Sequence, residues 1–206
     1  MSAVVTPPVP TGTTTPPPIA SGPQPWKWSR EDYRKLGELG FFDGRRVQLV
    51  FGEIIDMGKQ GWPHAAALAL LVEVLRRVFA TSHWIHEQKP FPVAGSEPEP
   101  DAAVIPGSPR NYTDHPTIAA LIVEVADTTL DYDLSTKAEL YATANVADYW
   151  VLDVSGRQLH VLRDPQPLPK GLGATAYRVH LTLGPADCVS PLAMPTASIL
   201  VSDLLP

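Results

Sequence analysis

The stretch Leu121-Ile-Val-Glu-Val-Ala-Asp127 decides the fold of this chain. Its first five residues are apolar and branched apart from one acid, and a short run of this kind predicts a buried strand. Glu124 lies in the middle of the run, where a carboxylate is costly to desolvate unless a neighbouring group compensates it. Strand alternation places Glu124 on one face with Ile122 and Ala126, and the other three apolar side chains on the opposite face.

The segment that follows carries the opposite charge in an equally unusual place. A helix is predicted from about Asp133 to Ala144, and Lys137 falls in its apolar stripe rather than on its polar face. Because helical side chains lean toward the helix N-terminus, Lys137 is expected to point back toward the strand that contains Glu124. The stripe is formed by residues at i, i+4 and i+7, namely Leu134, Ala138 and Tyr141.

Composition predicts one folded domain preceded by a disordered arm. The chain has 206 residues, of which 44% are hydrophobic, and this is enough for one well-buried core and hardly enough for two. Residues 1–25 hold eight of the 23 prolines, several threonines and no charged residue. Such a segment cannot bury a core and is predicted to be a disordered arm. The folded domain is expected to span residues 26–206.

Several classes of protein are disfavoured by the sequence. No stretch approaches the roughly 20 apolar residues that a membrane span requires, and the first residues lack the basic start and apolar run of a secretory signal. Cys188 is the only cysteine, which leaves no disulfide framework and no cysteine metal site. A soluble cytoplasmic protein is therefore expected. The net charge of −6 argues against nucleic acid as a partner, because phosphate binding normally needs a basic surface.

The order of predicted elements indicates a mixed sheet flanked by about three helices, hence an α/β or α+β fold. Capping and turn residues predict a helix Arg30–Glu38 and a β-hairpin Arg46–Met57 that turns at Phe51-Gly52. Apolar periodicity predicts the remaining elements. These are a helix Ala65–Phe79, strands at Trp84–Glu87, Pro90–Val93, Asp101–Ile105, Ala147–Asp153, Gln158–Leu162 and Ala176–Leu183, a loop Arg163–Gly173, and a closing helical turn Ile199–Leu205.

Three residues of this framework could form one chemical site. Asp101 starts a strand directly after a proline, Glu124 is buried in the strand expected beside it, and Lys137 points from a helix on the same sheet. Two converging carboxylates suit Mg²⁺ or Mn²⁺, which prefer hard oxygen ligands. Such an ion acidifies a bound water and stabilises charge on a phosphoryl oxygen, and a nearby ammonium can assist it. The set is therefore coherent with hydrolysis of a phosphodiester.

These residues and their neighbours resemble a known motif. Pro100-Asp101, Glu124 and a nearby lysine are similar to the PD-(D/E)XK nuclease motif, except that the position two residues after the acid is Ala126 rather than lysine. From Trp26 to the C-terminus the chain resembles the bacterial putative restriction endonuclease family, formerly a domain of unknown function. The matching segments are Val47–Ile54, Pro63-His64, Glu97–Asp101, Val123–Thr129, Tyr132-Asp133, Lys137–Ala142 and Ala147–Asp153.

The resemblance implies a restriction-endonuclease-like core with an added N-terminal β-hairpin. It assigns Asp101 and Glu124 as ligands of Mg²⁺ or Mn²⁺. Lys137 would be the catalytic base or charge stabiliser, displaced to the helix as is common in this family. Glu53 would be a further catalytic acid near the metal. Gln48 stands where the family commonly has glutamate, and this difference would weaken the site if that acid matters to activity.

Each of these residues also has a purely structural interpretation. Asp101 could cap a loop, the central acid and lysine could form a structural ion pair, and Glu53 could be an exposed acid after a hairpin glycine. His64 and Gln88 are possible supporting residues. His64 could contact the substrate or a proton, or simply cap a helix, and Gln88 could approach the metal site from its strand. No organic cofactor is expected.

Two functions of different classes remain open. The first is a Mg²⁺-dependent endonuclease that cleaves DNA as a homodimer, with the strands Tyr149–Val154 and Gln158–Leu162 as a dimer surface. The second is a binding or regulatory module that keeps the nuclease fold without effective catalysis, which the acidic charge and Gln48 favour. A small phosphodiester is a third, less favoured substrate. Uptake of Mg²⁺ or Mn²⁺ discriminates between the first two functions.

Overall fold

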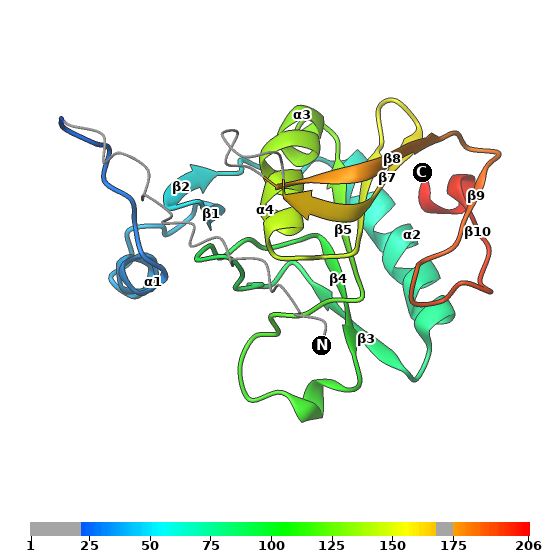
Figure 1. The fold of residues 1–206 in the computed structure, drawn as a ribbon, viewed down its shortest axis with the longest axis horizontal. Coiled ribbons are helices and arrows are strands. Elements are labelled where there is room, and N and C mark those ends of the chain that lie inside the picture. Colours follow the sequence, from blue (N-terminus) through cyan, green and yellow to red (C-terminus); the bar gives the residue numbers. More distant parts are fainter. Residues whose placement is uncertain (1–21, 168–174) are drawn as a thin grey trace, which may run out of the picture.

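A six-stranded mixed sheet forms the centre of the protein in the computed structural model, which describes residues 22–167 and 175–206 (Figure 1). Its strands in spatial order are β3 (His83–Glu87), β4 (Ala102–Pro106), β5 (Leu121–Ala126), β6 (Asp148–Asp153), β7 (Gln158–Pro167) and β8 (Thr175–Leu183). Strands β5 and β6 pair in parallel, and the other neighbours in this sheet pair antiparallel. The strand that contains Glu124 is therefore an interior strand, as its apolar sequence predicts.

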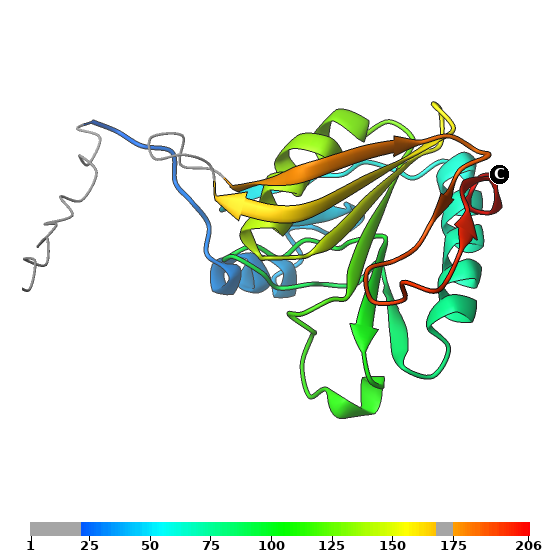
Figure 2. The ribbon, with the colours of Figure 1, turned by 45° about the vertical axis from the view of Figure 1, so that its right-hand side comes forward.

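Helices cover both faces of this sheet (Figures 1 and 2). They are α2 (Trp62–Phe79), α3 (Leu130–Tyr132), α4 (Ala138–Thr143) and a C-terminal 3-10 turn, Val201–Leu204. Helix α2 and the C-terminal turn share a core with Val123 and Val125, whereas α4 shares the opposite core with Ile122 and Ala126. This division confirms the predicted strand alternation, and it places Glu124 on the α4 side of the sheet.

A β-hairpin and one helix precede α2, as predicted. They are α1 (Arg30–Glu38), β1 (Val47–Val50) and β2 (Glu53–Asp56). Helix α1 buries none of its residues. It is attached by charge instead, because the Nε atoms of Arg30 and Arg34 lie 3.1 and 3.0 Å from the buried Glu97 carboxylate. The hairpin lies beside the segment that leads into β4, since the Glu97 N–H donates to the carbonyl of Leu49.

The helix that carries Lys137 differs from a regular α-helix. Between α3 and α4 the backbone forms a π-helical turn, Asp133–Lys137, a feature that often occurs at functional sites. Asp133 and Lys137 both face the interior, with 1% and 2% of their surfaces exposed. The helical segment begins at Leu130, earlier than the predicted Asp133, and ends at Thr143 rather than Ala144. The expectation that Lys137 points inward is confirmed.

Two predicted elements near the sheet edges are wrong in part. Pro90–Val93 forms no strand beyond an isolated bridge between Val93 and Ser96, because two prolines remove ladder donors from this run. The predicted loop Arg163–Gly173 begins too early, because β7 pairs with β8 as far as Pro167. The rest of that loop, residues 168–173, lies outside the described residues.

The chain ends also differ from the prediction. Residues 199–205 were expected to be helical, but Ile199-Leu200 forms β10, which pairs with β9 (Cys188–Val189) before the 3-10 turn begins. Of the predicted arm, residues 1–21 lie outside the described residues. No helix within residues 22–167 and 175–206 is long and apolar enough to cross a membrane.

The strands proposed as a dimer surface cannot serve as one. Strand β6 is buried along its whole length, because β5 and β7 occupy its two edges and helices cover its faces. Most of the adjoining part of β7 is buried as well, with β8 along its outer edge. The apolar sequence of these strands reflects the core of one chain, and any contact between two copies must use other residues.

Strand β3 contains a histidine that should make stability depend on pH. Burial, and then the positive charges of His115 and Lys89, lower the pKa of His86 from 6.5 to about 4. The unfolded chain therefore takes up a proton near pH 6.5 that the folded chain resists until about pH 4. We expect the free energy of unfolding to fall by no more than about 3 kcal/mol over this interval because of His86.

Urea denaturation of wild type and His86→Gln between pH 7 and pH 4 measures this contribution. The difference in unfolding free energy between the two proteins should change steadily below pH 6.5 and stay constant above it. Parallel pH profiles of the two proteins would show that His86 is protonated equally in both states.

Candidate active site

The register of β4 and β5 brings together the two predicted metal ligands. Ala102 pairs with Val123 across the antiparallel ladder, so Asp101, directly before β4, lies opposite Glu124. The Asp101 N–H donates to Glu124 Oε2 at 3.4 Å, and the Val125 N–H donates to Asp101 Oδ2 at 2.9 Å. Both carboxylates are buried, with 3% and 2% of the residue surfaces exposed. The sheet itself therefore fixes the distance between the two acids.

Side chains from three other segments contact the Asp101 carboxylate. His64 Nε2, in the first turn of α2, lies 3.0 Å from Oδ2, and the side-chain amides of Gln60 and Gln88 lie 3.2 and 3.1 Å from Oδ1. Arg46 Nη2 is 3.6 Å from Oδ1. Burial acts to raise the pKa of Asp101, but the hydrogen bond from His64 and nearby positive charge outweigh burial and hold this pKa below its usual value.

Lys137 and Tyr141 contact the second carboxylate. Lys137 Nζ lies 2.8 Å from Glu124 Oε1, and the Tyr141 hydroxyl donates to the same oxygen at 2.8 Å. Asp133 Oδ1 lies 3.6 Å from Lys137 Nζ. Burial raises the pKa values of Glu124 and Asp133. Burial acts to lower the pKa of Lys137, but the neighbouring carboxylates outweigh it and raise this pKa. Two buried carboxylates thus contact one buried ammonium, and a third, Asp101, is near enough for its charge to raise the pKa of Lys137 further.

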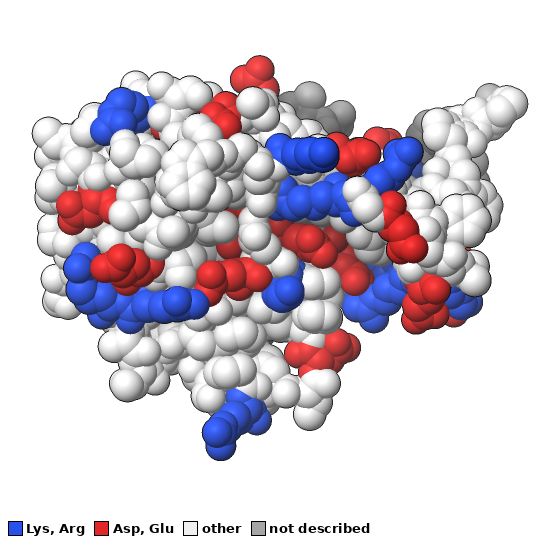
Figure 3. Space-filling view, turned by 180° about the vertical axis from the view of Figure 1, so that it is seen from behind, with Lys and Arg blue, Asp and Glu red and all other residues white. Residues whose placement is uncertain are grey.

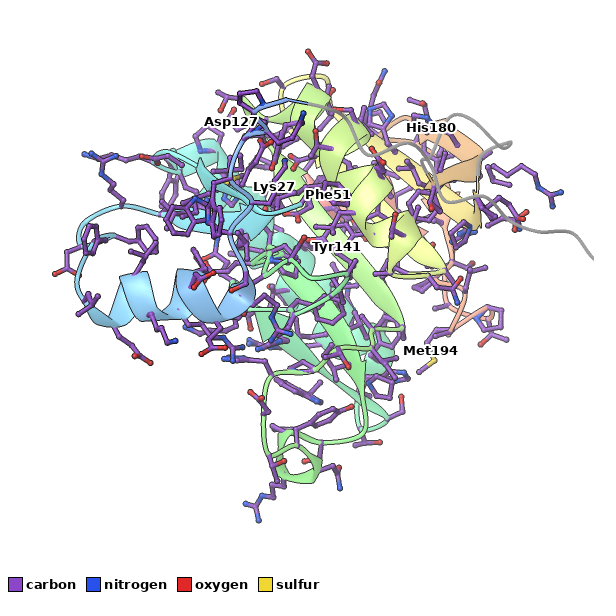
Figure 4. All side chains as sticks on the ribbon, turned by 60° about the vertical axis from the view of Figure 1, so that its left-hand side comes forward. Lys27, Phe51, Asp127, Tyr141, His180 and Met194 are labelled. Carbon is purple, nitrogen blue, oxygen red and sulfur yellow. The ribbon has the colours of Figure 1, made fainter. Side chains whose placement is uncertain are left out.

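These groups line a pocket where β4 begins and β5 ends. Its lining includes His64, Asp101, Glu124, Asp133 and Lys137. Figure 4 shows Tyr141 in the interior of the molecule and Asp127, which also lines the pocket, nearer the upper edge. The structure therefore brings together five residues that the sequence singled out: Asp101, Glu124, Lys137, His64 and Gln88.

Two other predicted positions lie outside this cluster. Glu53 opens β2, is exposed, and pairs with Lys27 Nζ at 2.6 Å, so the structure does not bring it to the two acids. Gln48 in β1 is fully buried, and its Nε2 donates to the Glu99 carbonyl at 3.2 Å. Gln48 Oε1 has no hydrogen-bond partner among the described residues. Gln48 thus supports the segment that leads to Asp101 rather than contacting Asp101 itself.

Sequence reasoning did not assign a role to Asp133, Gln60 or the Tyr141 hydroxyl. Asp133 precedes Lys137 by four residues, so helical periodicity alone could have placed it on the same inward face. The Tyr141 hydroxyl needed a buried partner, but the sequence does not show which acid it would meet. Gln60 lies in an irregular segment before α2, and no local signal predicts its contact with Asp101.

The Tyr141 hydroxyl offers a test of how much its hydrogen bond to the buried Glu124 contributes to the free energy of unfolding. We expect Tyr141→Phe to lower the free energy of unfolding by about 1.5–3 kcal/mol, because a buried hydrogen bond to a charged acceptor is lost. Tyr149→Phe is the matched control, since the Tyr149 hydroxyl is also buried but donates to a neutral carbonyl, that of Asp133, at 2.9 Å. The control should lose about 0.5–1.5 kcal/mol. Urea denaturation that gives Tyr141→Phe the smaller loss would show that Glu124 does not need this donor.

The donor set is compatible with a hard divalent cation. Asp101 and Glu124 supply carboxylate oxygens side by side, and the buried Asp133 Oδ1 has no hydrogen-bond partner among the described residues. Within these residues no three His, Cys, Asp or Glu side chains stand close enough to hold one ion by themselves. This agrees with the usual coordination of Mg²⁺, which is bound by one or two carboxylates and completes its octahedral shell with water and substrate phosphate. The residues therefore fit Mg²⁺ or Mn²⁺ bound in this way.

A mixed sheet with two carboxylates on neighbouring strands and a lysine beside them defines a restriction-endonuclease-like protein. The chain belongs to the Uma2 family, described as "Putative restriction endonuclease", whose model matches residues 30–187. A solved structure of a "putative nuclease belonging to DUF820" from Anabaena variabilis has the same fold, with a TM-score of 0.62 and 14% sequence identity. That likeness covers 85% of this chain and 96% of the other. No curated protein matches this sequence.

Proposed function

We propose that the chain is a metal-dependent endonuclease that hydrolyses phosphodiester bonds of DNA. One observation carries the proposal: Asp101 and Glu124 lie opposite each other on neighbouring strands, with Lys137 Nζ 2.8 Å from Glu124, in a pocket open to solvent. Membership of the family supports a nuclease-like function. Three buried carboxylates around one ammonium are an expensive arrangement for stability alone, which favours a catalytic reason for it.

Asp101 and Glu124 would hold Mg²⁺ or Mn²⁺, which supplies charge stabilisation at a phosphoryl oxygen and acidifies a water. His64 fixes the orientation of the Asp101 carboxylate, and Tyr141 fixes that of Glu124. Lys137 would stabilise negative charge on the substrate, because the neighbouring carboxylates raise its pKa and keep it protonated, which does not suit a proton acceptor. The role of Glu53 stays a sequence-based prediction, because the geometry gives it no support.

A second function is favoured by a different observation. Asp101 already accepts hydrogen bonds from Val125, Gln60 and Gln88, so the protein satisfies this carboxylate without a metal ion. Gln48 also stands where the family commonly has an acid. Both facts would suit a nuclease-fold module that binds nucleic acid or a regulator without cleaving it.

Cleavage of circular DNA separates these two functions. Purified protein is incubated with a supercoiled plasmid and with a single-stranded circular DNA, in Mg²⁺, in Mn²⁺ and in excess chelator. The endonuclease proposal expects nicked or linear products that carry 5′-phosphates, only when metal is present. Glu124→Gln prepared in the same way controls for a contaminating nuclease. Absence of cleavage in both metals, or equal cleavage by the variant, would contradict the proposal and leave the binding module.

A further inference from the structure

In the described part of the chain, basic side chains line the pocket but not the groove that continues it. Arg46 and Lys59 line the pocket, and Lys59 is exposed and forms no ion pair with the residues that the structure describes. A neighbouring groove continues the pocket, sharing Asp127, Thr128 and Thr129 with it, and the groove is also lined by Asp131 and Asp153. Among the described residues, no lysine or arginine lines that groove. Figure 3 shows basic and acidic side chains close together in one band of the surface.

An exposed tryptophan lies at the start of α2, next to this pocket. Trp62 is 81% exposed, an unusual state for so large an apolar side chain. Its neighbours in the chain, Gly61 and His64, both line the pocket. A Cβ at Gly61 would lie 3.5 Å from Asp127 Oδ2, so this part of the chain abuts a residue that the pocket and the groove share. Trp62 also begins a helix of 18 residues, which gives its ring a rigid base.

The charges that line the pocket and the groove, and the exposed Trp62, favour one kind of nucleic acid over another. A duplex presents phosphates of both strands, and those of one strand would face the three aspartates of the groove, where like charges repel. A single strand can direct its phosphates past Arg46 and Lys59 without entering the groove. It also offers unpaired bases, which stack readily on exposed aromatic rings in proteins that bind single strands.

We propose that the site takes a single strand of nucleic acid, with its phosphates along Arg46 and Lys59 and an unpaired base stacked on Trp62. This inference rests on the proposed nuclease function and names its substrate class. The recognised chemistry is a phosphodiester chain with free bases, which single-stranded DNA and RNA share. Trp62 acts as a positioning residue in this arrangement, since it holds the strand and does not touch the reacting atoms.

Fluorescence anisotropy of labelled oligonucleotides tests the inference without any need for cleavage. The probes are oligodeoxythymidylate, oligouridylate and a DNA hairpin duplex of equal nucleotide number, in Ca²⁺ at low salt. Wild type should bind the single strands at least about tenfold more tightly than the duplex. Trp62→Ala should weaken single-strand binding about tenfold, whereas Trp62→Phe, which keeps an aromatic ring, should stay within about threefold of wild type. The two single-stranded probes distinguish DNA from RNA.

Phe41→Ala is the control for loss of an exposed aromatic ring, because Phe41 is 67% exposed and lines neither the pocket nor the groove. It should bind like wild type. Equal or tighter binding of the duplex, no binding of either single strand, or an unchanged affinity in Trp62→Ala would each overturn the inference. Failure of the proposed function looks different: single strands would bind through Trp62 and yet survive with Mg²⁺ and Mn²⁺. Efficient cleavage of duplex by Trp62→Ala would instead keep the function and overturn the inference.

Discussion

Lys137→Met is expected to lower the free energy of unfolding by about 3–5 kcal/mol and to abolish DNA cleavage. Methionine preserves most of the volume of the side chain but removes the ammonium 2.8 Å from Glu124 Oε1. A carboxylate that is 2% exposed then keeps the Tyr141 hydroxyl and the Asp101 N–H as hydrogen-bond donors but has no cation in contact among the described residues. Urea denaturation measures the stability, and the circular-DNA assay measures the activity.

The double variant Lys137→Met with Glu124→Gln separates the structural cost from the catalytic loss. It removes both charges of the pair, so much of the stability lost in Lys137→Met should return. Its cleavage activity should stay at background, because a metal ligand and the lysine are both gone. A double variant less stable than Lys137→Met would show that the ion pair does not cause the loss. Cleavage by either protein at the wild-type rate would remove Lys137 from the mechanism.

Asp101→Ala is expected to lower the rate of DNA cleavage by at least about a thousandfold, because the proposed metal site loses one of its two carboxylates. Asp148→Ala is the matched control. Asp148 is also fully buried and accepts hydrogen bonds from Trp150 and Arg163, but it lies outside the pocket. The control should lose stability and retain the activity of its folded fraction. Comparable losses of activity in both variants would mean that Asp101 acts through folding alone.

The features predicted most accurately from the sequence are those that local patterns determine. Helix α1 and the hairpin have strong caps and turns, and their bounds agree closely with the prediction. The inward direction of Glu124 and Lys137 follows from two periodicities, of the strand and of the helix, and the structure confirms both. These inferences needed no knowledge of the partner elements, which is why they succeeded without a structure.

The remaining features depend on contacts between distant segments. The π-helical turn at Asp133–Lys137 and the extension of β7 to Pro167 follow from packing and strand pairing that no local signal contains. Glu53 is a different case, because its segment resembles the family motif while its carboxylate pairs with Lys27 at the surface, and its role near the metal stays a prediction. The long-range contacts of Gln60 likewise need the folded chain.

The most direct test of the central claim is the effect of Mn²⁺ on the melting temperature of wild type and Asp101→Ala. A ligand that binds the folded state stabilises it by mass action. The account predicts that saturating Mn²⁺ raises the wild-type melting temperature by several degrees and leaves that of Asp101→Ala unchanged. If neither protein responds, or both respond equally, Asp101 and Glu124 do not form a metal site, and the Glu124–Lys137 pair is a structural element of a binding module.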